Sequence, residues 1–130
     1  MDLRHVVLVV EDEPLVRIAL ALELEAAGFS VLQASSADTA IAILETNSEI
    51  RVVFTDIQMP GTMDGVELAR YVRKHWPPTI IVVCSGKVAL EQGQLPDDIP
   101  FLAKPYDPRT FDRLMRLVGT RIADGGHSQP

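Results

Sequence analysis

Short apolar runs rich in β-branched residues alternate along the chain with longer stretches in which apolar residues recur every three or four positions. The short runs predict five buried strands, at Val6–Val10, Phe29–Ala34, Arg51–Thr55, Thr79–Cys84 and Pro100–Ala103. The longer stretches predict helices between the strands. The first of these begins at Pro14, where a missing N–H is harmless, and ends at Gly28.

Polar capping residues mark where the other helices begin. Ser35 or Ser36 precedes the second helix, Asp64 the third, and Asp107 the last, which has a proline at its first position. The stretch from Lys87 to Gly93 is only weakly helical, because Gly93 and a nearby proline interrupt it. We expect that region to be short or loosely ordered.

Strands alternating with helices predict an α/β fold, a three-layer α/β/α sandwich around a five-stranded parallel sheet. The 130 residues fit one domain. We expect this domain to span residues 1–118. Residues 119–130 lose the apolar pattern, which predicts a flexible C-terminal tail.

The composition narrows the classes of function. A net charge of -6 and a pI near 4.9 argue against a nucleic-acid-binding surface. No apolar run approaches the ~20 residues that a membrane-spanning helix needs, and the N-terminus lacks the apolar segment of a signal peptide. We therefore expect a cytoplasmic protein that binds neither membrane nor nucleic acid. The one cysteine, Cys84, lies inside an apolar run, which predicts a buried and unreactive thiol.

Polar residues collect where the predicted strands end. Glu11 and Asp12 follow the first strand, Asp56 the third, Ser85 the fourth and Lys104 the fifth. If the first and third strands are neighbours, the three carboxylates converge on one crevice at the edge of the sheet. Carboxylates without histidine or cysteine ligands favour a hard cation such as Mg²⁺. The lysine and serine are suited to contact phosphate oxygens, and a metal-bound aspartate can accept a phosphoryl group as an acyl phosphate.

These short motifs occur in the order that is typical of one family. The acid pair Glu11-Asp12, the sequence DIQMPG around Asp56, CSG around Ser85 and LAKPY around Lys104 together resemble the receiver domain of two-component response regulators. The resemblance covers the chain from Val6 to about Val118. It implies the flavodoxin-like strand order 2-1-3-4-5.

The resemblance also implies roles for individual residues. Asp56 would be the phospho-acceptor, and Mg²⁺ would be held by Asp12, Asp56 and the backbone carbonyl of Gln58. Glu11 stands where aspartate is commoner in the family. Because its side chain is one methylene longer, we expect it to act on the metal through water instead of as a direct ligand.

Other residues match the family's switch and its phosphate contacts. Ser85 and Phe101 would be the switch residues, and Lys104 would contact the phosphoryl group from a cis peptide bond to Pro105. Phe101 has no hydroxyl where many members carry tyrosine. Gln58 and Lys87 occupy positions that are thought to set the lifetime of the phosphorylated form.

The function implied is that of a stand-alone receiver, which accepts a phosphoryl group from a histidine kinase or a histidine phosphotransfer protein and catalyses only its own phosphorylation and dephosphorylation. Its output would pass to a downstream protein through the face around Lys87 to Gly93, Phe101 and the last helix.

The first helix has two apolar stripes. The family alignment places one against the sheet: Val16, Ala19, Leu20, Leu24 and Ala27. This leaves Leu15, Ile18 and Leu22 as a second, exposed stripe that is suited to self-association or kinase docking.

Three other functions stay open. A phosphorelay shuttle or phosphate sink would use the same chemistry but pass the group on. A phosphohydrolase with Asp56 as nucleophile would lack its acid/base, because Gln58 stands where such enzymes carry a second aspartate. A metal-free interaction module would leave the reactive residues unused.

Overall fold

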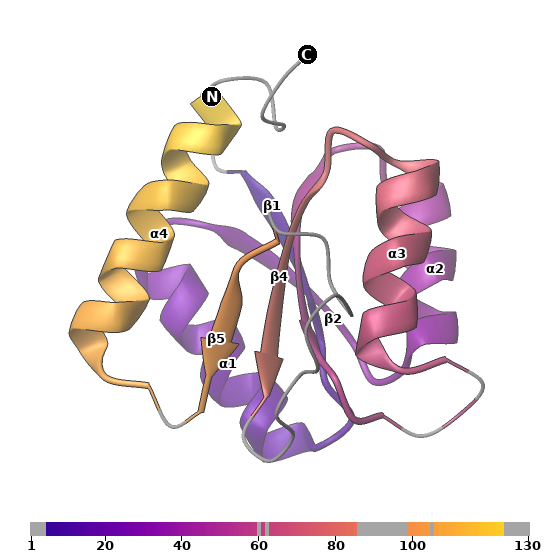
Figure 1. The fold of residues 1–130 in the computed structure, drawn as a ribbon, viewed down its shortest axis with the longest axis horizontal. Coiled ribbons are helices and arrows are strands. Elements are labelled where there is room, and N and C mark those ends of the chain that lie inside the picture. Colours follow the sequence, from indigo (N-terminus) through magenta and orange to yellow (C-terminus); the bar gives the residue numbers. More distant parts are fainter. Residues whose placement is uncertain (1–4, 60, 62, 86–98, 105, 124–130) are drawn as a thin grey trace.

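The computed structural model describes residues 5–59, 61, 63–85, 99–104 and 106–123, and it shows a parallel sheet between two layers of helices (Figure 1). The strands lie in the order β2-β1-β3-β4-β5. They are β1 (Val6–Val10), β2 (Ser30–Ala34), β3 (Ile50–Asp56), β4 (Ile80–Ser85) and β5 (Phe101–Ala103). The predicted fold class and strand order are confirmed, and each strand boundary lies within one residue of its prediction.

Four helices lie within the described residues, and they cover the two faces of the sheet in pairs. They are α1 (Pro14–Ala26), α2 (Ala37–Thr46), α3 (Gly65–His75) and α4 (Pro108–Ala123). Side chains of α2 and α3 join one buried cluster, and those of α1 and α4 join the other. In Figure 1, accordingly, α2 and α3 lie on one side of the strands and α1 and α4 on the other.

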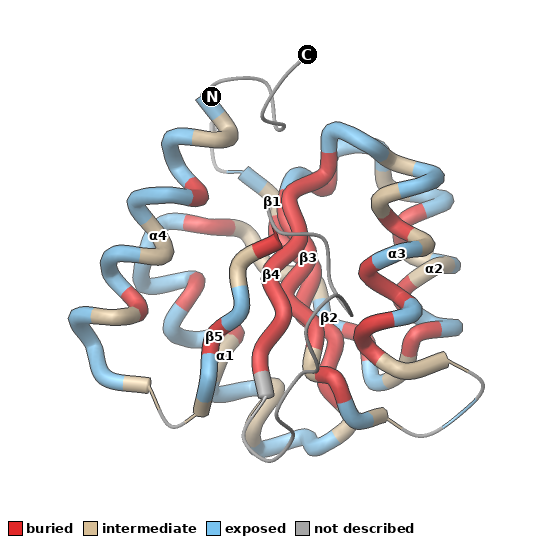
Figure 2. The backbone as a smooth tube through the Cα atoms, in the orientation of Figure 1, coloured by how far each residue is buried: buried red, intermediate tan, exposed pale blue. Residues whose placement is uncertain are grey.

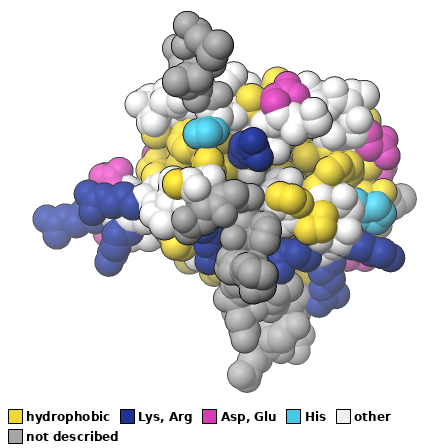
Figure 3. Space-filling model, turned by 90° about the horizontal axis from the view of Figure 1, so that it is seen from above, with side chains coloured by type: hydrophobic (Ala, Val, Ile, Leu, Met, Phe, Trp, Pro, Cys, Tyr) yellow, Lys and Arg dark blue, Asp and Glu magenta, His cyan; other side chains and the backbone are white. Residues whose placement is uncertain are grey.

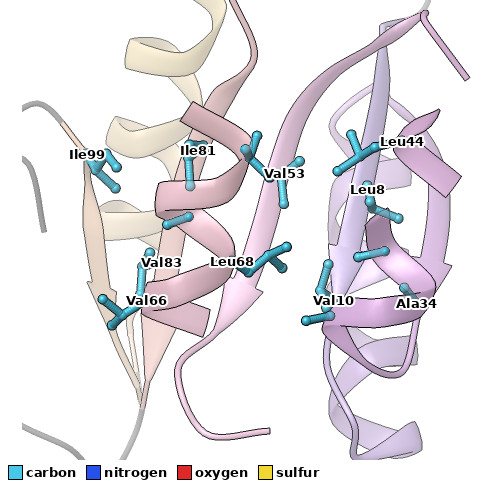
Figure 4. Packing of buried hydrophobic residues seen from close by; sticks show 14 of the residues in the cluster. Leu8, Val10, Ala34, Leu44, Val53, Val66, Leu68, Ile81, Val83 and Ile99 are labelled. Atoms are coloured by element: carbon cyan, nitrogen blue, oxygen red, sulfur yellow. The ribbon is translucent and has the colours of Figure 1, made fainter. Parts of the chain in front are cut away.

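The central strands are buried on both faces, which explains their continuous apolar sequences. β1 and β3 are almost entirely buried, and in Figure 2 the red of buried residues is concentrated in these strands. The cluster on the α2 and α3 side joins side chains from β1, β2, β3 and β4, with Leu8 and Val53 at the centre of the sheet and Leu44 and Leu68 on the helices (Figure 4). Close packing on both faces of the sheet fixes the positions of the strands and therefore the edge at which their carboxyl ends lie.

Side-chain caps explain where three helices begin. The backbone N–H of Thr39 donates to Ser36 Oγ at 3.2 Å, which decides between the two predicted serine caps. Asp64 and Glu67 form a reciprocal capping box at the start of α3. Asp107 accepts a hydrogen bond from the Thr110 N–H at 2.8 Å at the start of α4. This bond lowers the pKa of the Asp107 carboxyl.

The inward face of α1 differs from the prediction. Ala19 and Ala27 were expected to face the sheet but are exposed, whereas Ala21 and Leu24 are buried. Alanine is small enough to be tolerated on either face of a helix, so its spacing says little about which face is buried. The second stripe is exposed as expected, with exposed fractions of 83% for Leu15, 45% for Ile18 and 60% for Leu22.

Helix α4 continues past Val118, where the domain was expected to end, to Ala123. Ile122 packs against the same apolar cluster as Val118, which explains why the helix extends through Gly119. Residues 124–130 and the stretch 86–98, which includes the expected weak helix from Lys87, lie outside the described residues. The domain boundary therefore stays a prediction.

Cys84 lies in the core of the sheet, as expected. Burial raises the pKa of its thiol to about 12, which keeps it protonated and unreactive near neutral pH. At the surface, Lys and Arg side chains protrude at the left edge of the view from above, on the side of α4 (Figure 3). None of the described helices combines the length and the apolar character that crossing a bilayer would require.

Candidate functional site

Three carboxylates meet at the carboxyl ends of β1 and β3. The two strands are neighbours, with Val10 paired to Thr55, so that the residues after them leave the sheet side by side. One oxygen each from Glu11, Asp12 and Asp56 lies within 4.8 Å of the others. The structure thus brings together the three acids that the sequence placed at strand ends.

Lys104 reaches this cluster from the end of β5. Its Nζ lies 3.2 Å from Glu11 Oε1, where it donates a hydrogen bond, and 3.9 Å from Asp56 Oδ2. β3 and β4 separate β5 from β1, so the long lysine side chain has to span the end of the sheet. The lysine charge therefore lies between the two carboxylates and offsets part of their repulsion.

The Asp56 carboxylate is held at one oxygen. The N–H of Ile57 donates to Oδ1 at 2.7 Å, while Oδ2 is the oxygen nearest Lys104. The Asp56 side chain is 16% exposed, so it is accessible to a reactant from solvent.

Glu11 is buried, and both of its side-chain oxygens have protein partners. Oε1 accepts from Lys104, and Oε2 accepts from the N–H of Glu13 at 3.1 Å. Asp12 and Asp56 are only partly buried. These contacts suit an indirect part for Glu11 at a metal, since its oxygens are already used.

The donor set fits Mg²⁺. Clustered carboxylate oxygens from two neighbouring strands are the hard ligands that this ion prefers, and the partial exposure of Asp12 and Asp56 leaves room for coordinated water. Such an ion would neutralise the carboxylates and the charge of an incoming phosphate.

The other predicted site residues are less fully described. Ser85 ends β4 at the same edge of the sheet, but its side chain lies outside the described residues, as do Lys87 and Pro105 with its predicted cis bond. Gln58 follows Asp56 by two residues and is exposed. Phe101, on the edge strand β5, is 41% exposed.

Gly65 is a site residue that the sequence analysis missed. Its N–H donates to the Ile57 carbonyl at 2.8 Å, and a side-chain carbon at this position would overlap the carbonyl group of Asp56. The first residue of α3 therefore lies directly against the backbone of Asp56. The only sequence signal was a glycine directly after the helix cap Asp64, which is not specific.

An apolar groove lies beside Lys104. It has a volume of about 300 Å³ and lies between α1 and the chain that follows β5, with Leu15, Leu20, Cys84 and Tyr106 among its lining residues. The Tyr106 hydroxyl donates to Glu23 Oε1 on α1 at 2.8 Å. Burial and this contact raise the pKa of the tyrosine. The groove joins the acidic site to the exposed stripe of α1.

Comparison with known proteins agrees with this arrangement. A match to the response regulator receiver domain covers residues 7–115. The chain belongs to this family. Its members take part in two-component phosphorelay signalling, and apart from their own phosphorylation and dephosphorylation they are generally not enzymes.

Both curated proteins and solved structures resemble the chain. It is 36% identical over 106 residues to the transcriptional regulatory protein ResD of Bacillus subtilis, covering 79% of this chain and 43% of ResD. The structure of a response regulator receiver protein from Sinorhizobium medicae matches with a TM-score of 0.81 and 30% identity, over 92% of this chain and 98% of that one.

A second structure bears on the metal. The response regulator TrrA of Thermotoga maritima, in complex with Mg²⁺ and beryllofluoride, matches with a TM-score of 0.73 and 26% identity over 90% of this chain and 98% of TrrA. The solved receivers therefore correspond to nearly the whole chain. By contrast, the chain spans about half the length of the first curated relatives, 43% and 56%.

The contact of Gly65 with Asp56 predicts a sensitive position. Gly65→Ala should lower the free energy of unfolding by roughly 1–3 kcal/mol, because the α3 N-terminus must move away from Asp56, and it should slow phosphorylation. Gly119→Ala on α4 is the matched control, since its added carbon meets open space. Urea unfolding and labelling with phosphoramidate measure both effects. Equal behaviour of the two variants would contradict the prediction.

Proposed function

We propose that this chain is a cytoplasmic receiver that accepts a phosphoryl group on Asp56 from a histidine kinase or a histidine phosphotransfer protein. The observation that supports it most is the meeting of Glu11, Asp12 and Asp56 within 4.8 Å, with Lys104 Nζ between Glu11 and Asp56. A carboxylate nucleophile, a metal-ligand set and a cation for phosphate oxygens are the parts that phosphoryl transfer needs.

In the proposed reaction, Asp56 Oδ2 attacks the phosphorus of a phosphohistidine. The new P–O bond forms as the P–N bond breaks, and the imidazole leaves with the electron pair of that bond. Ile57 N–H holds Oδ1, which leaves Oδ2 directed toward the reactant. Lys104, 3.9 Å from Oδ2, would follow the phosphoryl oxygens and exchange its contact with Glu11 for one with phosphate.

Mg²⁺ would be held by Asp12, Asp56 and the Gln58 carbonyl, with Glu11 acting through water. When bound, it would supply positive charge for the oxygens of the transferring group. Gln58 and Lys87 would tune the lifetime of the product, and Ser85 with Phe101 would transmit its formation to a downstream protein.

Docking of the phosphodonor on α1 is supported by the surface. Leu15, Ile18 and Leu22 are exposed, and Leu15 also lines the apolar groove beside Lys104. A helix of the donor, or a second copy of this chain, can bury apolar side chains there. The groove lies against the site that must meet the phosphohistidine.

Phosphorylation should depend on Asp56 and on Mg²⁺. Asp56→Asn should abolish the gain of one phosphoryl mass after incubation with phosphoramidate, and EDTA should do the same for the unaltered protein, because the carboxylates then repel the phosphate. Asp112→Asn, an exposed change on α4, is the matched control. Labelling of Asp56→Asn at the normal rate, measured by intact mass, would exclude the proposal.

Two charges on the exposed stripe should separate docking from chemistry. Ile18→Glu with Leu22→Glu should leave labelling by phosphoramidate unchanged but reduce transfer from a phosphorylated histidine kinase by roughly tenfold or more, or abolish self-association, since charged groups resist burial in an apolar interface. Leu117→Glu on α4, also at an exposed leucine, is the control. Kinase transfer assays and sedimentation measure the two effects. If the double variant keeps both transfer and self-association, the docking surface is excluded.

On phosphorylation, a switch changes its structure away from Asp56, whereas a phosphate sink does not. Beryllofluoride with Mg²⁺ should perturb the amide signals of Lys87 to Gly93 and Phe101 if a hydrogen bond from Ser85 draws its loop toward the phosphoryl group. Ser85→Ala should suppress those changes but still permit phosphorylation. Spectral changes confined to the loops around Asp12 and Asp56 would favour the sink or shuttle.

A further inference from the structure

Arg17 is a charged residue on the inward face of α1. It lies one helical turn before Leu20 and Ala21, which face the sheet, and it is partly buried. Its Nη1 donates to the backbone carbonyl of Glu11 at 2.9 Å, and its Nε donates to Gln33 Oε1 on β2 at 3.1 Å. The guanidinium therefore joins α1, β2 and the loop that leaves β1.

The contact fixes one peptide group beside the acidic cluster. The N–H of Glu11 donates to the Ala34 carbonyl at 3.0 Å, which continues the pairing of β1 with β2. Its carbonyl, where the chain turns toward α1, accepts from Arg17. The orientation of the Glu11–Asp12 peptide sets the direction in which the Asp12 side chain leaves the backbone. Arg17 can thereby act on the position of Asp12 through the backbone.

Arginine suits this geometry better than lysine does. The planar guanidinium presents donors in fixed, diverging directions, so that Nε can be held by Gln33 while Nη1 reaches the Glu11 carbonyl. A lysine would keep the positive charge but has a single ammonium on a flexible stem. Gln33 is itself exposed, and its side-chain oxygen holds the guanidinium from β2.

We propose that Arg17, braced by Gln33, is a positioning residue that holds Asp12 in the orientation needed to bind Mg²⁺. The inference rests on the proposed function, since it assumes that Asp12 binds the metal. In this role Arg17 raises the affinity of the site for Mg²⁺, although its positive charge alone would lower it. A positive charge beside three carboxylates weakens cation binding, whereas an ordered ligand strengthens it.

The test measures Mg²⁺ binding by calorimetry in the absence of any phosphodonor. Arg17→Met removes the charge, so electrostatics alone would tighten binding; loss of positioning should instead weaken it by about tenfold or more. Arg17→Lys should also weaken binding, because it keeps the charge without the two directed donors. Arg116→Met, at an exposed arginine on α4, is the control for loss of one charge and should leave affinity near that of the unaltered protein.

Gln33→Met tests the contact between Gln33 and Arg17 separately, because the substitution changes no charge and Gln33 lies at the surface. It should weaken Mg²⁺ binding by roughly threefold, less than the Arg17 variants, which lose the direct contact. For all variants, phosphorylation by phosphoramidate should recover at saturating Mg²⁺, as expected if affinity alone is altered.

Unchanged or tighter Mg²⁺ binding by folded Arg17→Met would overturn the positioning role. If Arg17→Met does not fold, unchanged binding by Gln33→Met would overturn it instead. Failure of the unaltered protein to bind Mg²⁺ and to be labelled on Asp56 would have a different meaning, since it would refute the proposed function itself.

Discussion

The close approach of three carboxylates is the constraint on which the rest of the site depends. At separations within 4.8 Å, two full charges repel by on the order of 3 kcal/mol at the effective dielectric typical of protein surfaces. The pairing of β1 with β3 and burial on both faces of the sheet hold the acids there. Lys104 from β5 offsets part of this repulsion.

Backbone N–H groups also offset the repulsion between the carboxylates. Glu13 N–H donates to Glu11 and Ile57 N–H donates to Asp56, so each of these carboxylates accepts a hydrogen bond from a residue one or two positions after it. Such bonds order only one side chain each, because the backbone donors are already fixed by the turn into the next element. Glu11 and Asp56 are therefore stabilised both by their own loops and by Lys104 from the far side of the sheet.

The strands and their chemical ends could be predicted because the signal is local. A strand buried on both faces needs an unbroken apolar run, and a charged residue directly after it has to lie at the edge of the sheet. This reasoning located Glu11, Asp12, Asp56 and Lys104. Arg17 and Gly65 could not be found in this way, because their partners are backbone groups six and eight or nine residues away in sequence. Apolar periodicity contains no information about a carbonyl that needs a donor.

Helix α1 contacts both the loop that carries the acids and the chain that follows Lys104. Through Arg17 it holds the loop of the acids, and through Glu23 it accepts the hydroxyl of Tyr106, two residues after Lys104. A displacement of α1 would thus alter a contact to the loop that carries Glu11 and Asp12 and a contact to the chain after Lys104 together. The opposite side of the same helix exposes Ile18 and Leu22. A protein that packed there would therefore contact the helix that also holds the loop of the acids. If the phosphodonor docks on this side of α1, its effect on the proposed acceptor site would pass through the helix itself.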